Sequence, residues 1–121
     1  MNENQSIKIK NLIAEGSYKE ALDVINKFQK EETLTGKENL TLLYQKCEVF
    51  TSLGEYSKTI TLAIELRKES KKQKDLLLEI DALSYEIYAN YRLNKYDFCS
   101  IIQRIVVAYS FNAYSFSLAV R

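Results

Sequence analysis

The chain has 121 residues, of which 17 are basic and 16 acidic, so its formal net charge is only +1. A balanced charge gives no overall attraction to nucleic acid or to an anionic membrane. The chain has no His, no Pro and only three Gly, which removes the usual general base and metal ligand and leaves no flexible linker between domains. We therefore expect a single domain that is not an enzyme and that binds no metal or cofactor.

The first predicted repeat, residues 1–34, is a pair of helices joined at the turn Gly16-Ser17-Tyr18. Gly suits a helix C-terminus because it adopts the left-handed conformation at little cost. Ser17 and Glu20 have the spacing of a capping box, which marks the start of the second helix. That helix continues with apolar residues at helical spacing, at Ala21, Ile25 and Phe28.

The second predicted repeat, residues 35–74, has the same pattern. Thr35 and Glu38 form another capping-box pair at its start. The turn at Gly54 lies 38 residues after the turn at Gly16. The apolar positions of the two helices are Leu40, Leu43, Cys47 and Phe50 before the turn and Ile60, Ala63 and Ile64 after it.

A basic run closes this repeat, and it consists of Arg67, Lys68, Lys71, Lys72 and Lys74. Such a cluster can contact the phosphates of nucleic acid or lipid. The run falls where a helix should end, however, and cations are stabilised there by the helix dipole. No aromatic residue is interleaved for base stacking. We therefore expect a solvated helix terminus, with no nucleic-acid or membrane partner.

The third predicted repeat, residues 75–109, turns at Asn94-Lys95-Tyr96, 40 residues after Gly54. A nearly fixed period of this size indicates stacked supersecondary units. The tyrosine of each turn is expected to fill the gap between units as part of the core. The apolar positions of this repeat are Leu76, Ile80, Leu83 and Ile87 before the turn and Ile102, Val106 and Tyr109 after it.

The last residues, 110–121, form an apolar tail, and no charged residue occurs from Ile105 to Val120. Apolar spacing at steps of three and four extends the last helix, whereas alternation from Tyr114 to Val120 also fits a strand. The end of a repeat stack needs a polar outer face. We therefore expect a partner subunit, a homodimer contact, the groove of the same molecule or missing downstream sequence to cover the tail. The helical stripe is Ile102, Val106, Tyr109, Ala113, Phe116 and Val120.

The turns and their flanking residues resemble the tetratricopeptide repeat family. The resemblance is carried by Leu43, Cys47, Phe50, Leu53, Gly54, Tyr56, Thr59 and Ala63 in the second repeat, by Leu83, Leu93, Asn94, Tyr96 and Cys99 in the third, and by Leu12, Gly16, Tyr18 and Ala21 in the first. The repeats are longer than the usual ~34 residues, lack the terminal Pro, and have Ile87 and Asn90 in place of a small and an aromatic residue. The resemblance implies an all-α fold, a right-handed α-α superhelix (solenoid) of three long helix hairpins.

In this family the leading helix of each hairpin lines a concave groove. The groove positions implied here are Thr41, Tyr44, Gln45, Glu48, Thr51 and Ser52 in the second repeat and Asp81, Ser84, Tyr85, Tyr88, Tyr91 and Arg92 in the third. Exposed tyrosines offer a large contact area at low entropy cost; the alternative is that they pack against the tail or neighbouring helices. We expect partner contacts at Tyr44, Gln45, Glu48, Tyr85, Tyr88, Tyr91 and Arg92.

The resemblance implies a non-catalytic protein–protein interaction scaffold that binds a peptide or protein segment. The Lys, Arg and Asn quartet with which some members grip a chaperone C-terminus is absent, and Glu48 and Asp81 would repel a carboxylate. We therefore expect a peptide of mixed charge with apolar anchors. Two alternatives stay open: a structural module that forms a homo-oligomer through its apolar tail, and a peptide-sensing regulator.

The expected location is the cytoplasm. Cys47 and Cys99 lie within helix patterns, which favours reduced, buried thiols over a disulfide framework. The first ten residues include Glu3 and no continuous apolar run, so we expect no secretory signal. No stretch of the sequence is a convincing transmembrane span.

Overall fold

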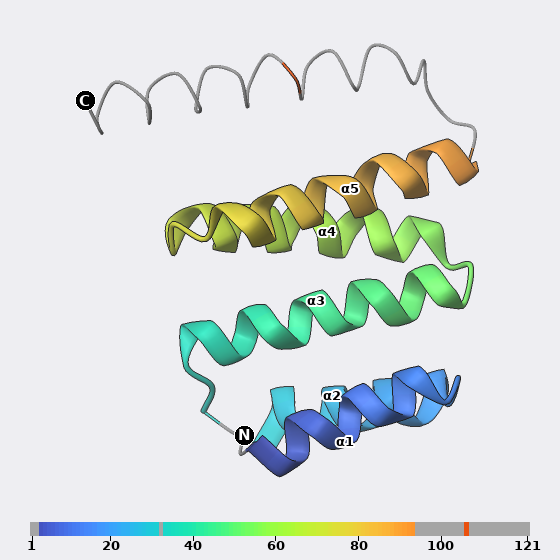
Figure 1. Ribbon diagram of the computed structural model, residues 1–121, viewed down its shortest axis with the longest axis vertical. Coiled ribbons are helices and arrows are strands. Elements are labelled where there is room, and N and C mark those ends of the chain that lie inside the picture. The colour runs from blue at the N-terminus through green and yellow to red at the C-terminus, as the bar shows by residue number, and fades with distance from the viewer. Residues whose placement is uncertain (1–2, 32, 94–105, 107–121) are drawn as a thin grey trace.

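The computed structural model describes residues 3–31, 33–93 and 106, and these residues form five α-helices and no strand (Figure 1). The all-α prediction is confirmed for this part of the chain. No helix in it combines the length and the apolar character needed to cross a bilayer. The predicted sixth helix and the tail lie outside the described residues, apart from Val106. The helices are α1 (Glu3–Ala14), α2 (Tyr18–Glu31), α3 (Gly36–Ser52), α4 (Tyr56–Lys72) and α5 (Leu76–Leu93).

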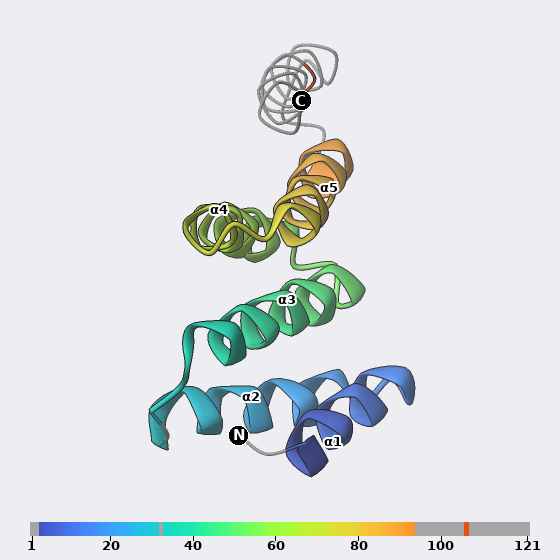
Figure 2. The ribbon, with the colours of Figure 1, turned by 60° about the vertical axis from the view of Figure 1, so that its left-hand side comes forward.

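The helices are stacked along the long axis of the molecule, and each runs opposite to the one before it (Figure 1). α1 and α2 pair at one end, α4 and α5 pair at the other, and α3 lies between the pairs in contact with α2, α4 and α5. The rotated view shows α4 set to one side of α3 and α5 (Figure 2). Consequently α3 and α5, which begin successive predicted repeats, contact each other directly.

The predicted turn chemistry at Gly16 and Gly54 is confirmed. Their φ angles are 81° and 76°, in the left-handed region. In each turn the residue after the glycine donates its backbone N–H to a carbonyl five residues earlier, at 2.9 Å. The α4–α5 turn has the same hydrogen bond, but its left-handed residue is Lys74, with φ 58°. The sequence pattern places a repeat boundary here, between residues 74 and 75, but it does not identify Lys74 as the left-handed residue, because lysine carries no turn signal.

Two of the helix starts are fixed by side-chain caps. The backbone N–H of Glu38 donates to Thr35 Oγ1 at 3.2 Å, and the N–H of Thr35 donates to Glu38 Oε1 at 3.2 Å. The predicted capping box at the start of α3 is therefore confirmed. At the start of α5 the backbone N–H of Leu78 donates to Asp75 Oδ1 at 3.1 Å, a cap that the sequence analysis did not identify.

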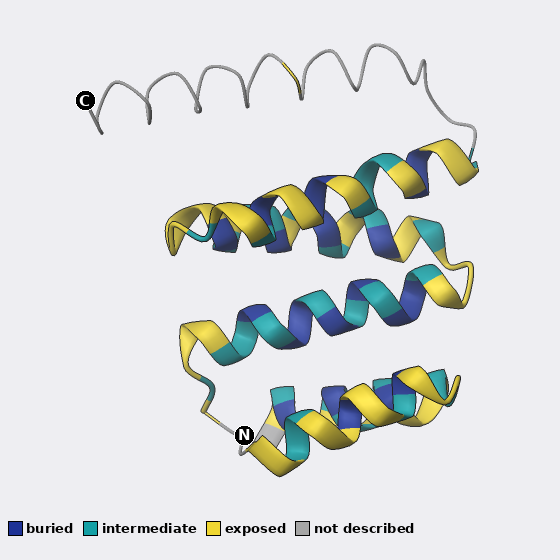
Figure 3. Ribbon diagram, in the orientation of Figure 1, coloured by how far each residue is buried: buried dark blue, intermediate teal, exposed yellow. Residues whose placement is uncertain are grey.

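The core is divided by α3 into two clusters. One lies between α1, α2 and α3, and the other between α3, α4 and α5. Because α3 is covered on two sides, buried or half-buried residues follow most of its length (Figure 3). The buried members are Ile9, Ile13, Ala21, Ile25, Phe28, Leu42 and Val49 in the first cluster and Leu40, Leu43, Cys47, Ala63, Leu66 and Ala82 in the second.

Cys47 is a free thiol in the second cluster with no exposed surface. Burial raises the pKa of Cys47 to about 12, and the negative charge of Glu65 acts in the same direction. The thiol therefore stays protonated and unreactive at neutral pH. Cys99 lies outside the described residues.

The apolar stripe predicted for α5 is partly wrong. Leu83 is buried as expected, but Leu76 and Ile80 are 50% and 43% exposed. Two small residues, Ala82 and Ala89, are fully buried instead, since small side chains let α5 approach its neighbours closely. Compared with the predicted orientation, α5 is therefore rotated about its axis, and Leu76 and Ile80 lie on its exposed side.

Candidate functional site

Two tyrosines bridge α3 and α5. Tyr44 extends from α3 and Tyr85 from α5, and their ring centroids are 5.7 Å apart with an interplanar angle of 70°. This is the edge-to-face arrangement that aromatic pairs favour. Both residues are half-buried and pack against the core cluster of α3, α4 and α5. Their rings are therefore held in place by the core.

A second aromatic pair follows along α5. Tyr88 packs edge-to-face against Tyr56 of α4, with ring centroids 5.9 Å apart. The guanidinium carbon of Arg92 lies 5.4 Å from the Tyr56 centroid and 6.0 Å from the Tyr88 centroid, which is within cation–π range. Tyr88 remains 42% exposed. Tyr88 and Arg92 are thus held against neighbouring rings while both residues remain exposed.

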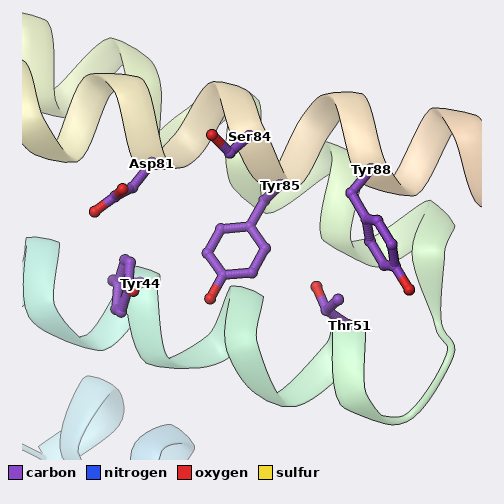
Figure 4. A pocket seen from close by; sticks show the side chains of 6 residues that line it. All are labelled: Tyr44, Thr51, Asp81, Ser84, Tyr85 and Tyr88. Atoms are coloured by element: carbon purple, nitrogen blue, oxygen red, sulfur yellow. The ribbon is translucent and has the colours of Figure 1, made fainter.

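A cavity of about 300 Å³ opens between these groups (Figure 4). In Figure 4 the Tyr85 ring points from α5 toward α3, between Tyr44 and Thr51. Ligand pockets typically have volumes of about 300–1,000 Å³, so this cavity suits a single side chain better than a whole small molecule. It is lined by Tyr44, Thr51, Asp81, Ser84, Tyr85 and Tyr88.

The polar groups that line the cavity differ in whether they are free to form a hydrogen bond with a ligand. The hydroxyls of Thr51 and Ser84 both donate to backbone carbonyls of their own helices, at 2.6 and 3.1 Å. Burial raises the pKa of Tyr85, and the neighbouring Tyr44 adds to the shift. The Tyr85 phenol therefore keeps its proton at neutral pH, and because a hydrogen bond with the Tyr44 side chain contributes to the shift, its oxygen remains available to accept another. The carboxylate of Asp81 is exposed and can accept one.

The site has an acidic end and a basic end. Asp81, Tyr85, Tyr88 and Arg92 follow one another at steps of four, three and four along α5, so they share one helix face. The helical rise places Asp81 and Arg92 about 16 Å apart along the axis. Between them, Glu48 of α3 lies close enough to Tyr85 for its charge to contribute to the raised pKa of that residue.

The structure brings together five of the seven residues predicted as partner contacts. Tyr44, Tyr85 and Tyr88 line the cavity. Arg92 adjoins the Tyr88 ring, and Glu48 is the half-buried acidic neighbour of Tyr85. These five side chains come from two helices that are separated in sequence and adjacent in space.

Gln45 is not part of this surface, and the prediction that it faces a groove is wrong. It is only 3% exposed and lies between Leu42 and Val49 at helical spacing, on the side of α3 that packs against α1 and α2. The repeat pattern predicts one buried face for α3, whereas α3 packs against helices on two sides and buries both faces. Tyr91 is 62% exposed and does not line the cavity.

The sequence analysis missed the role of Tyr56 at this site. It treated Tyr56 only as a packing residue of the turn, yet the ring contacts both Tyr88 and Arg92. No local signal could have revealed this, because Tyr56 and Tyr88 are 32 residues apart in the sequence. Elsewhere, no group of three or more Cys, Asp or Glu side chains among the described residues is arranged to hold a metal ion.

No protein-family model, curated protein or solved structure matches the chain.

Proposed function

We propose that the chain is a non-catalytic interaction module of the tetratricopeptide repeat type, and that its α3–α5 face binds a segment of a partner protein in the cytoplasm. In this proposal α1–α2 and α3–α4 are complete hairpins, α5 begins a third, and the stack continues as a right-handed superhelix. The matching turns at Gly16 and Gly54 and the direct contact of α3 with α5 support this architecture. The buried free thiol of Cys47 is consistent with a reducing compartment.

The observation that carries the proposal is the set of partly exposed aromatic rings held in fixed positions around a cavity. Edge-to-face contacts order Tyr44, Tyr85 and Tyr88 before any ligand arrives. A ligand then loses little free energy to ordering of the site, which is how rigid scaffolds gain affinity. Tyrosine and arginine are also among the residues that most often dominate binding energy.

The cavity defines the anchor of the bound segment. A volume of about 300 Å³ lined mainly by tyrosine rings accepts a leucine, methionine or aromatic side chain. The Tyr85 hydroxyl, which shares a hydrogen bond with Tyr44, can accept one from a backbone N–H of the segment. The site thus supplies one apolar contact and one oriented hydrogen bond.

The charges define the flanks of the segment. Asp81 favours a basic side chain at one end, and Arg92 favours an acidic side chain at the other. Their axial separation of about 16 Å corresponds to roughly five residues of extended peptide at about 3.3 Å per residue. We therefore expect a basic residue, an apolar anchor and an acidic residue spread over about six positions. Glu48, between the two ends, disfavours a terminal carboxylate there.

The proposal can be tested by selecting binders from a random peptide display library on the full chain and measuring their affinity by fluorescence polarisation. Tyr88→Ala removes a ring of the cavity and should weaken the selected peptides at least tenfold, about 1.4 kcal/mol. Tyr91→Ala is the matched control, because Tyr91 lies on the same helix, is 62% exposed and does not line the cavity.

Circular dichroism should show that both variants keep their helical content. Equal loss of binding in the two variants, or none in either, would contradict the site assignment. Failure to select any peptide above background would count against a peptide-binding function altogether.

A further inference from the structure

Arg92 of α5 is a cation that forms no ion pair with any residue that the structure describes. Its guanidinium carbon instead lies 5.4 Å and 6.0 Å from the ring centroids of Tyr56 and Tyr88. Glu86, the acidic residue closest to it along α5, pairs with Arg67 of α4 at 3.0 Å. Contact with a ring face leaves the N–H donors at the edge of a guanidinium free. Arg92 can therefore still bind a planar anion through two parallel hydrogen bonds.

Tyr56 is the side chain that fixes this position. Its ring is the nearer of the two to Arg92, and it packs edge-to-face on Tyr88 with ring centroids 5.9 Å apart. Tyr56 is itself half-buried at the start of α4. A free arginine loses the freedom of a long side chain when it binds, which costs roughly twofold to tenfold in affinity. Tyr56 removes part of this cost because it orders Arg92 before the ligand arrives.

The contact is not a general feature of the repeat. Tyr18 occupies the same turn position as Tyr56 one repeat earlier, and Ser52 of α3 stands where α5 has Arg92. Tyr18 packs against the α1–α2 cluster. A tyrosine in this turn thus fulfils its packing role without a cation beside it. Packing of the repeat therefore does not require the arginine.

We propose that Tyr56 determines the preference of the α3–α5 site for an acidic residue, because it holds the Arg92 guanidinium where a carboxylate of the bound segment docks. This inference rests on the proposed peptide-binding function, and it adds α4 to a surface formed by α3 and α5. Tyr56 is a positioning residue, since it acts through Arg92 and needs no contact with the ligand. Only its aromatic ring is used, so phenylalanine can replace it and leucine cannot.

The geometry is tested in the free chain by NMR. Protons above the face of an aromatic ring resonate upfield, so the side-chain signals of Arg92 should be shifted in that direction. Tyr56→Phe should keep the shift, whereas Tyr56→Leu should reduce it by about half, since the more distant Tyr88 ring remains. A shift that Tyr56→Leu leaves unchanged, or no shift in the wild-type protein, would overturn the proposal.

The role in binding is tested with a peptide selected on the full chain that has glutamate at its acidic flank, and with the same peptide carrying glutamine there. The wild-type protein should prefer the glutamate peptide about tenfold, because glutamine lacks the charge-assisted pair. Tyr56→Leu should reduce the preference to about threefold, while Tyr56→Phe keeps it. Tyr18→Leu is the matched control and should also keep it, since Tyr18 holds the equivalent turn position away from the site.

A double-mutant cycle shows whether the ring acts through the arginine. In an Arg92→Gln background, Tyr56→Leu should have no further effect on the preference for glutamate. If Tyr56→Leu weakens both peptides equally, or if the selected peptides have no acidic flank, this inference fails while peptide binding stands. If no peptide is selected at all, the proposed function fails and this inference fails with it.

Discussion

Replacing Gln45 by methionine should stabilise the protein. Gln45 is 3% exposed, and among the described residues neither its Nε2 nor its Oε1 has a hydrogen-bond partner. Leaving a buried polar group unpaired costs about 1–3 kcal/mol. Methionine has nearly the same volume and shape, so it removes the unpaired amide without opening a cavity. The free energy of unfolding should therefore rise by about 1–3 kcal/mol.

The measurement is urea unfolding followed by circular dichroism, with thermal unfolding as a second readout. The midpoint temperature should rise by roughly 4 °C for each kcal/mol gained. Gln73→Met is the control, because Gln73 is exposed at the end of α4 and its replacement should change stability by less than about 0.5 kcal/mol. If Gln45→Met destabilises the protein by about 1 kcal/mol or more, the amide has a partner and the reasoning fails.

Two further predictions concern the α4–α5 turn and the buried thiol. Lys74→Gly should raise the free energy of unfolding by about 1 kcal/mol, because Lys74 has φ 58° and glycine adopts that conformation without strain; an unchanged denaturation midpoint would contradict this. Burial raises the pKa of Cys47 to about 12, whereas an unfolded thiol ionises near pH ~8.5. The folded state then retains a proton that the unfolded state releases, so the free energy of unfolding should fall as the pH rises from about 8.5 toward 12. Cys47→Ala should reduce that slope between pH ~8 and ~10 in urea titrations, and identical slopes would refute the assignment.

The features that the sequence predicted correctly are those with local causes. Gly16 and Gly54 end helices because only glycine adopts positive φ cheaply, and the structure places both in that region. The Thr35 and Glu38 pair opens α3 because both partners of the cap lie within one turn. Lys71 and Lys72 of the basic run fall in the last turn of α4, where the helix dipole favours them, whereas Arg67 pairs with Glu86 of α5 at 3.0 Å.

The features that the sequence did not predict depend on long-range packing. The polar character of Gln45 favours a groove position, but α3 has neighbours on two sides and buries this residue. Leu76 and Ile80 belong to the predicted apolar stripe of α5. The helix packs through Ala82 and Ala89 instead, and Leu76 and Ile80 are left exposed. The contact of Tyr56 with Arg92 joins two helices, and nothing local in the sequence encodes it.

The central claim is that α3 and α5 together form a binding surface lined by tyrosine. Tyrosine-ring NMR spectra, recorded while a selected peptide is titrated into the full chain, test it directly, because each of the nine tyrosines reports on its own position. The ring signals of Tyr44, Tyr85 and Tyr88 should shift, while that of Tyr18, which packs against the α1–α2 cluster, should not. A shift of Tyr18 with the three cavity rings unchanged would contradict the claim.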